Sequence, residues 1–355
     1  MSKPLKVILI VAACIFLIIL LALAGLLWLN AGEYKPQDRE LVEVSPQISL
    51  IPARSVPIEL LSWNIGYASL DASQDFFMDG GTGVRPATAR NAEENIWAIK
   101  AFISSVIPDI VFLQEVDVNS KRSYGINQVA YFSETWMGSS AFAHNFKHPF
   151  IPVPFPNFIG RVESGLLTLN SYTSTAERIS LPSSFEWPER VFQLKRCLLV
   201  ARVPVQNSNT ELVLVNLHLE AYDEGGQGRI AQTRALAEFL KAEYAKGNYC
   251  VAGGDFNQVF PALQDVYPIV QNEFFTPAIL DEKLFGEGWI LAADPSVPTT
   301  RSLDKPYDGS RENHQFYIIN GFILSPNVEL ISMQTIDLDF QNSDHNPVRL
   351  IFSLQ

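Results

Sequence analysis

A run of 23 residues without a charged side chain, Val7 to Leu29, divides the chain into a segment suited to lipid and a remainder suited to water. At about 1.5 Å per residue a helix of this length spans about 34 Å, more than the roughly 30 Å hydrocarbon core of a bilayer. Lys3 and Lys6 precede the run, and charges of both signs follow it. The positive-inside rule then predicts a single-pass protein of the cell membrane, anchored by residues 1–32, with an extracytoplasmic domain.

Two other interpretations of the N-terminus stay open. Ala22-Leu23-Ala24 has the small residues of a signal-peptide cleavage site, although the apolar run continues past it and is longer than usual. Val11-Ala12-Ala13-Cys14 resembles a lipoprotein cleavage box, but an apolar run follows the cysteine where polar residues are expected. Residues 33–57 are mixed polar with four prolines, so we expect a stalk between the membrane and the domain at 58–355.

Composition narrows the class of the domain. Hydrophobic residues make up 47% of the chain, enough for the sizeable core of one large α/β domain. The net charge of −12 repels polyanions at long range and disfavours non-specific DNA binding. Of the three cysteines, Cys197 and Cys250 lie in apolar strand-like segments and are expected to be buried thiols; a bridge between them is the one open alternative.

Apolar strand-like runs alternate with helical patterns after residue 57, without an internal repeat. Two amphipathic helices are expected, at Arg90–Val106 and Arg229–Ala245. The spacing of the strands, some without a helix between them, predicts two mixed β-sheets packed face to face and covered by helices. The expected strands are Ile58–Trp63, Ile110–Gln114, Gly165–Asn170, Cys197–Val203, Glu211–Leu217, Tyr249–Ala252, Phe316–Leu324 and Val348–Phe352.

Aromatic residues and prolines are concentrated in the segment Phe146–Phe158. We expect a long loop or lid beside the site there, because loops of this length are usually functional or mobile. His144, His148 and His314 lack an apolar strand setting and are expected to be loop residues.

Polar residues follow several of these strands at their ends. Asn64 ends the first strand, and an Asn there offers a carbonyl oxygen to a metal or an NH₂ group to a phosphate. Glu115 follows a buried strand at Gln114, and a hard divalent cation would make a carboxylate tolerable in that place. His218 ends the very apolar strand 211–217 and can bond a phosphate oxygen or protonate a leaving group.

Two short motifs complete the constellation. In Gly253-Gly254-Asp255-Phe256-Asn257 the glycines permit a tight bend, and Asp255 and Asn257 share a face when extended. In Ser343-Asp344-His345 an adjacent carboxylate and imidazole can serve as metal ligand and general base. A turn and a solvated charge pair are the ordinary alternatives for each motif taken alone.

Taken in order, these five pieces resemble the endonuclease/exonuclease/phosphatase superfamily over roughly residues 58–353. The resemblance implies a four-layer α/β sandwich of two mixed β-sheets flanked by helices, here preceded by one transmembrane helix. It also implies hydrolysis of phosphoesters that depends on Mg²⁺, with Mn²⁺ as the alternative ion. By this resemblance Glu115 is the principal metal ligand, with Asn64 beside it and Asp344 as a further ligand.

The resemblance also implies the catalytic roles. Asp255 would orient or activate the attacking water, Asn257 and His218 would contact the phosphate, and Asp344 with His345 would close the site. His218 would in addition assist the leaving group.

One position departs from the family pattern. The family usually has an Asp in the strand before the closing motif, where it bonds the closing His, but Asn320 stands at that place in Ile318-Ile319-Asn320-Gly321-Phe322. A neutral amide stabilises an imidazolium far less than a carboxylate does. Either the activity is weakened, or another carboxylate takes the place, and Asp308, Asp337 and Asp339 are the nearby candidates.

The sequence thus predicts a membrane-anchored phosphodiesterase or endonuclease-like hydrolase. Its substrate would be a nucleic acid, a phospholipid headgroup or a small phosphoester, and no protein partner is inferred. The alternatives are a sphingomyelinase- or phosphoinositide-phosphatase-like enzyme and a degenerate, non-catalytic binding protein. A zinc enzyme is disfavoured, because no His/Cys cluster at ligand spacing is present.

Overall fold

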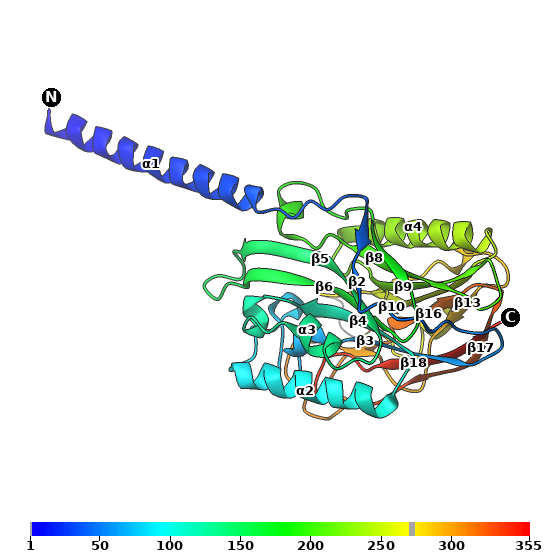
Figure 1. Cartoon of the computed structure of the whole chain (residues 1–355). Helices are drawn as coiled ribbons and strands as arrows, with labels where there is room; N and C mark the ends of the chain where they lie inside the picture. Colours follow the sequence, from blue (N-terminus) through cyan, green and yellow to red (C-terminus); the bar gives the residue numbers. More distant parts are fainter. Residues whose placement is uncertain (1, 270–273) are drawn as a thin grey trace.

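Two seven-stranded mixed sheets packed face to face form the domain in the computed structural model, which describes residues 2–269 and 274–355 (Figure 1). The first sheet has the spatial order β17 (Val328–Thr335), β18 (Val348–Leu354), β3 (Ile58–Asn64), β4 (Ile110–Asp117), β6 (Gly160–Asn170), β5 (Ser139–Ile151), β2 (Val44–Ser45). The second has the order β1 (Arg39–Val42), β7 (Thr175–Ser180), β8 (Cys197–Pro204), β9 (Glu211–His218), β10 (Tyr249–Asp255), β16 (Asn320–Leu324), β13 (Ile290–Ala292).

The remaining elements are helices and two small ladders. The helices are α1 (Lys3–Ala31), α2 (Ala89–Val106), α3 (Gln128–Ser133) and α4 (Gln227–Tyr244). The ladders pair β11 (Gln258–Val259) with β12 (Ala278–Ile279), and β14 (Thr300–Arg301) with β15 (Phe316–Tyr317). The α/β sandwich that the sequence predicts is therefore confirmed.

The main core lies between the two sheets, where alternate residues of each strand point inward. Leu60 and Phe112 of the first sheet meet Leu214 and Val251 of the second, all fully buried. Burying a Leu, Val or Phe side chain contributes about 1.5–3 kcal/mol, so this layer is a large favourable term in folding.

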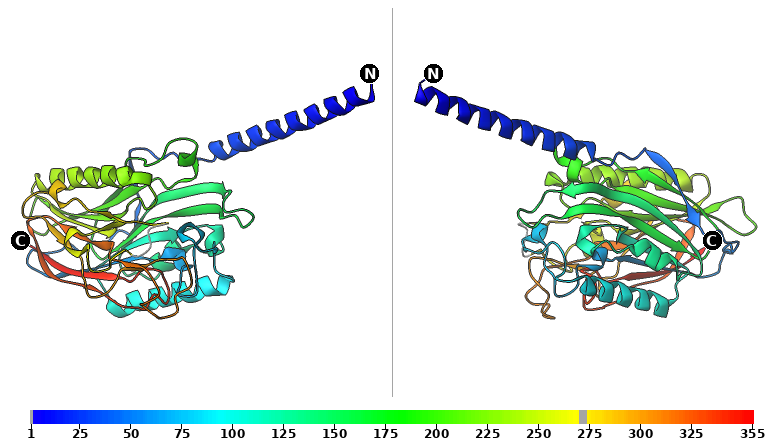
Figure 2. Two further views of the ribbon diagram at one scale, coloured as in Figure 1. Left: turned by 180° about the vertical axis from the view of Figure 1, so that it is seen from behind. Right: turned by 60° about the vertical axis from the view of Figure 1, so that its left-hand side comes forward.

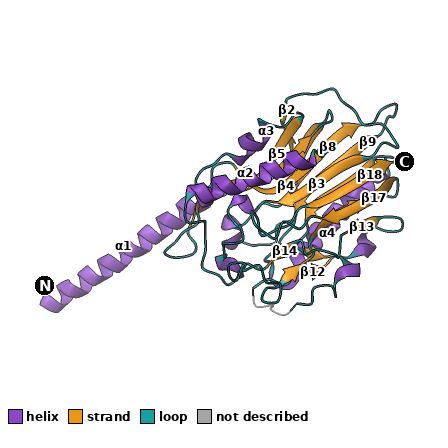
Figure 3. Cartoon of the chain, turned by 90° about the horizontal axis from the view of Figure 1, so that it is seen from below, coloured by secondary structure: helices purple, strands orange, loops and turns teal. Residues whose placement is uncertain are grey.

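One long helix covers the outer face of each sheet. The apolar stripe of α2, which includes Ile96 and Ile99, packs on Trp63 and Leu113, and Figure 3 shows α2 across the first sheet. Residues of α4 such as Leu236 pack in the same way on the second sheet. With α2 outside the first sheet and α4 outside the second, the domain has the four layers that the sequence predicts: helix, sheet, sheet and helix.

Local sequence explains where α2 begins and ends. The Thr88 side chain accepts a hydrogen bond from the backbone N–H of Asn91 at the first turn. Ile107 leaves the helix in a left-handed conformation, immediately before Pro108, which disfavours a helical residue in front of it.

The segment 33–57, expected as a stalk, lies against the domain instead. Its strands β1 and β2 pair with β7 and β5, one in each sheet. Glu33 is buried and forms ion pairs with Arg190 and Lys195. The prediction of a free spacer is therefore wrong for this segment.

Two further local predictions are corrected. The expected loop Phe146–Phe158 is a strand up to Ile151, because β5 continues beside β6, and His144 and His148 therefore lie in a strand rather than a loop. The expected strand Phe316–Leu324 is interrupted between β15 and β16. His314 lies in a loop as expected, and the three cysteines are free thiols.

Helix α1 projects away from the domain in every view (Figures 1 and 2). None of its described side chains is buried, and by length and composition it is long and apolar enough to cross a membrane. An N-terminal signal sequence has the same properties.

A buried carboxylate at the end of α4 gives a stability prediction. Burial alone would raise the pKa of Glu243, but hydrogen bonds from Arg202, Lys246 and Asn248 lower it to about 2. Because the folded state favours the ionised form, this stabilisation is complete above pH 4.5 and is lost as the pH falls towards 2.

We therefore expect Glu243→Gln to lower the free energy of unfolding by about 2 kcal/mol at pH 7 and by progressively less below pH 4.5. Urea unfolding at several pH values measures the difference. Glu94→Gln, in an exposed pair with Arg90, is the control and should change stability by less than about 0.5 kcal/mol. An equal loss for Glu243→Gln at all pH values would contradict the assignment.

Candidate active site

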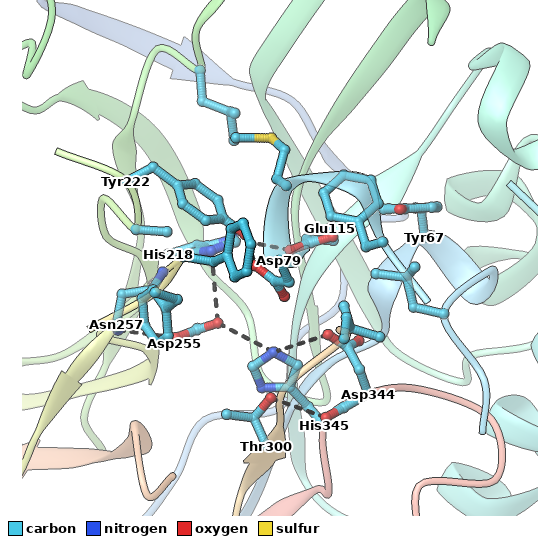
Figure 4. Close-up of a pocket in the computed structure, with 18 of the residues that line it drawn as sticks. Tyr67, Asp79, Glu115, His218, Tyr222, Asp255, Asn257, Thr300, Asp344 and His345 are labelled. Atoms are coloured by element: carbon cyan, nitrogen blue, oxygen red, sulfur yellow. Dashed lines mark hydrogen bonds and ion pairs between the residues drawn. The ribbon is translucent and has the colours of Figure 1, made fainter. Parts of the chain in front are cut away.

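The polar strand ends singled out in the sequence meet in one cavity of about 360 Å³ (Figure 4). Each sheet contributes one parallel pair of strands. In the first sheet Asn64 at the end of β3 lies in register with Gln114 of β4, and in the second His218 at the end of β9 lies in register with Asp255 of β10. Parallel neighbours end at the same edge of a sheet, and this brings residues far apart in the sequence together.

Asp255 lies at the centre of the cluster. Its Oδ2 atom accepts a hydrogen bond from Asn64 Nδ2 at 3.0 Å and lies 3.6 Å from His218 Nε2 and 3.7 Å from His345 Nε2. Its other oxygen accepts the backbone N–H of Asn257 at 3.0 Å. Gly254, with φ of +142°, approaches Leu217 so closely that a Cβ atom would lie 2.0 Å from the Leu217 carbonyl oxygen, so only glycine fits there.

Glu115 reaches the cavity through an irregularity of β4. The register of β4 with β6 shifts between Leu113 and Val116, and Glu115 has a φ of +57°. A side chain in that left-handed region costs about 1–3 kcal/mol, and such residues are concentrated at functional sites. Glu115 Oε1 accepts a hydrogen bond from Asn64 Nδ2 at 3.1 Å and lies 3.9 Å from His218 Nδ1.

Asn64 connects these two carboxylates. Its Oδ1 atom accepts the backbone N–H of Gly66 at 3.1 Å, so the NH₂ group is the part that faces Glu115 and Asp255. In this orientation Asn64 offers a donor to the cavity, and its use as an oxygen ligand, which stays a prediction, requires the amide to turn over.

Asp344 and His345 come from the loop between β17 and β18 and complete the cluster. His345 Nε2 lies 3.7 Å from Asp344 Oδ2. On its other side, His345 Nδ1 lies 2.9 Å from Asn320 Oδ1, so a proton on Nδ1 has an acceptor. Asn320 is in register with Asp255 across the β10–β16 pair, at the place where the family pattern has an Asp.

Within the described part of the chain, no carboxylate takes the place of the expected Asp at His345 Nδ1. Asp337 pairs with Arg311, Asp339 accepts from Tyr307, and Asp308 lies 3.5 Å from His314. The hydrogen-bond partner of His345 Nδ1 among the described residues is the Oδ1 atom of Asn320.

Asn257 lies at the rim with a φ of +49°, and its Nδ2 donates to the carbonyl oxygen of Leu219 at 2.9 Å. One of its two N–H bonds is therefore used by the backbone, and the other is left for a ligand. All the predicted site residues thus lie on the cavity or in hydrogen-bond contact with its lining.

Burial controls the electrostatics of the cluster. It raises the pKa of Asp344 to about 7 and raises the pKa of Glu115, which the neighbouring Asp344 charge raises further. Burial also lowers the pKa of His218 well below its usual range and lowers that of His345. Both imidazoles are therefore neutral at pH 7, while Asp344 titrates near it.

The donor set suits a hard divalent cation. Neither Glu115 nor Asp344 has an Lys or Arg ion pair within 4 Å among the described residues. Two carboxylates with raised pKa values that face one space are the arrangement that a cation would stabilise. No group of three His, Cys, Asp or Glu side chains in residues 2–269 and 274–355 is arranged to hold a metal ion by itself.

Sequence reasoning missed several residues of the cavity wall. Arg301 of β14 is buried and donates to the carbonyl oxygens of Asp71 and Gln74, and its Nε has no hydrogen-bond partner in residues 2–269 and 274–355. The Tyr222 hydroxyl donates to Asp79 at 2.8 Å. These residues lie on short or irregular segments, where no periodic pattern marks them.

Two buried ion pairs, also missed, flank the cluster. Arg122 pairs with Asp117 at 3.0 Å and lies over the Tyr67 ring, and Arg196 pairs with Glu220 at 3.3 Å. A sequence signal that could have revealed such a pair is a charged residue next to a very apolar strand, such as Arg196 immediately before β8.

Known structures share this fold. An endonuclease/exonuclease/phosphatase from Beutenbergia cavernae DSM 12333 has a TM-score of 0.57 and 17% identity, covering 84% of this chain and 72% of that one. Danio rerio TDP2 complexed with a single-strand DNA product has a TM-score of 0.52 and 17% identity, over 84% and 100%. The human Nocturnin catalytic domain with bound sulfate has a TM-score of 0.50 and 16% identity, over 88% and 98%.

Sequence comparison identifies the family directly. No curated protein matches the chain. The model of the endonuclease/exonuclease/phosphatase family matches residues 61–267, which include the end of β3 and all of β4, β9 and β10, with their strand-end residues. The chain belongs to the endonuclease/exonuclease/phosphatase family and is a metal-dependent phosphoester hydrolase.

Proposed function

We propose that the domain hydrolyses phosphodiesters with Mg²⁺, using the cluster around Asp255. The observation that carries this proposal is the position of Asp255 Oδ2, within 3.7 Å of two neutral imidazoles and 3.0 Å from Asn64. A carboxylate held this way can take a proton from water and pass it to a neighbouring imidazole.

Glu115 and Asp344 would hold the ion, with Asn64 beside them. The bound cation would supply positive charge to the phosphate oxygens and to the leaving oxygen. The residues present fit Mg²⁺, because it takes oxygen ligands and keeps several waters. Mn²⁺ accepts the same oxygen donors.

The remaining site residues would transfer protons and hold the phosphate. The oxygen of a water attacks phosphorus as its proton passes to Asp255, and the bond from phosphorus to the leaving oxygen breaks. His218, neutral at rest, lies 3.6 Å from Asp255 and would relay a proton to that leaving oxygen. Asn257 and Arg301 would bond the phosphate oxygens.

His345, once protonated at Nε2, would stabilise the charge that develops on phosphate. A proton on its Nδ1 has Asn320 Oδ1 as acceptor, and Nε2 faces Asp255 and Asp344. Asn320 thus supports the ring orientation that an Asp would give, without its charge. This arrangement supports an enzyme that turns over slowly, rather than the degenerate binding protein that Asn320 alone suggested.

Helix α1 would anchor the domain in the cell membrane, with the site on the extracytoplasmic side. Its exposed apolar surface and the basic residues Lys3 and Lys6 before it support this orientation.

Asp255→Asn tests the proposed base. We expect hydrolysis of bis(4-nitrophenyl) phosphate in Mg²⁺ to fall by about 10²–10⁴-fold, because the amide cannot accept the proton. EDTA should abolish the wild-type rate. The exposed Asp265→Asn is the control and should keep full activity. A variant with unchanged kcat would remove Asp255 from the mechanism.

Asn320→Asp tests the role of the neutral partner. A carboxylate against Nδ1 should raise the pKa of His345, which burial now lowers, and should increase kcat by at least about tenfold at pH 7. An NMR titration of the His345 ring and a pH–rate profile measure the two effects. A raised pKa without any gain in rate would show that the charge of His345 does not limit turnover.

A further inference from the structure

The cavity has two chemically different halves. The catalytic cluster with Arg301 forms the polar part, whereas Phe146 and Ile151 line it within one apolar cluster, with Phe77, Phe192 and Leu194 packed against them. Its volume of about 360 Å³ is that of a ligand pocket rather than a packing defect. Apolar side chains that line it include Phe77, Met78, Phe146, Ile151, Phe192 and Leu194.

The charges of the wall fit one phosphate rather than a polyanion. Of the three arginines that line the cavity, Arg122 and Arg196 are neutralised by Asp117 and Glu220. Arg301 alone among these described residues has no carboxylate ion pair. A nucleic acid needs several cations along its backbone, and the net charge of −12 adds to the mismatch.

The apolar half lies next to the end of helix α1. His148 Nε2 is 3.0 Å from the carbonyl oxygen of Leu29, and the His148 ring packs edge-on against Phe192 of the cavity wall. Glu33, just after the helix, pairs with Arg190 and Lys195, which flank the same wall segment. His148 and Glu33 thus connect the cavity wall to the helix end.

Aromatic side chains are exposed around this junction. Phe155, at the tip of the β5–β6 hairpin, is 86% exposed. Trp187 is 55% exposed, and its Nε1–H donates to Asn30 Oδ1. In Figures 1 and 2 this hairpin and α1 leave the same side of the domain. Exposed aromatic side chains near the end of a membrane-spanning helix are typical of the interface between membrane and water.

We propose that the apolar half of the cavity binds the chain of a membrane lipid whose phosphodiester lies at the catalytic cluster. The inference rests on the proposed function, since it names the substrate class of the same site. The lipid would enter beside α1, from the membrane that this helix spans, with its chain along Phe77, Phe192 and Leu194 and its phosphate towards Arg301.

Matched esters test this directly on the full-length chain in amphipol. Methyl and dodecyl 4-nitrophenyl phosphate differ only in the chain, and in both water replaces 4-nitrophenol at phosphorus. We expect kcat/KM for the dodecyl ester, kept below its micelle concentration, to exceed that for the methyl ester by at least about 100-fold. Equal values would overturn the lipid assignment and leave the phosphodiesterase intact.

A blocking variant locates the chain. Leu194→Trp should reduce the ratio of dodecyl to methyl kcat/KM by at least about tenfold, and its circular dichroism spectrum reports whether the variant folds. Ile331→Trp, at an exposed position on the edge strand β17, is the control and should keep the wild-type ratio. If Leu194→Trp does not fold, Phe77→Ala provides the same comparison. Unchanged selectivity in the folded variant would overturn the proposed position of the chain.

Binding without turnover separates the two proposals. Equilibrium dialysis of both esters against Asp255→Asn should show at least about tenfold tighter binding of the dodecyl ester. If neither ester is hydrolysed by the wild type but this preference remains, the proposed function fails and the chain site stands. Absence of the preference contradicts the chain site whatever the catalytic result.

Discussion

The site depends on one contact between the sheets, the hydrogen bond from Gln114 Nε2 to Asn216 Oδ1 at 2.8 Å. Asn216 Nδ2 also donates to the carbonyl oxygens of Leu113 and Leu167 in the opposite sheet. These fully buried amides fix the distance between two pairs of parallel strand ends. Because buried polar groups without partners are costly, the network specifies one alignment of the sheets and therefore one geometry of the cluster.

Much of this arrangement was predictable from the sequence. Asn64, Glu115, His218 and Asp255 each end or interrupt an apolar run, and chain topology brings such ends together. The local structure at 33–57 and 146–151 was predicted wrongly for a physical reason. Strand β2 pairs with β5, almost 100 residues away, and neither the prolines of 33–57 nor the aromatics of β5 reveal that partner.

The backbone of Glu115 and the place of Arg301 were equally hidden. A bulge depends on the partner strand, so the sequence of β4 alone predicts a regular strand. Arg301 lies on a two-residue strand whose burial is decided by the loops around it. The cavity itself arises from segments spread between Tyr67 and His345, and no local pattern encodes such a volume.

Asn320 and the apolar cavity together give a consistent account of the chain. A neutral partner for His345 lowers the charge that the site can develop, which a slow enzyme tolerates when its substrate is concentrated. A lipid in the same membrane as α1 would be concentrated in this way, since an anchored enzyme meets such a substrate at a high effective concentration. The proposed site chemistry, the apolar cavity wall and the proposed anchor are thus consistent with one substrate class.

We expect Glu115 and Asp344 to form a divalent cation site in the full-length chain. Calorimetric titration of Mg²⁺ into the wild type, Glu115→Gln and the exposed control Glu94→Gln measures this binding directly. One saturable binding event should appear in the wild type and in Glu94→Gln, and it should be lost in Glu115→Gln. The same affinity in all three proteins would contradict it.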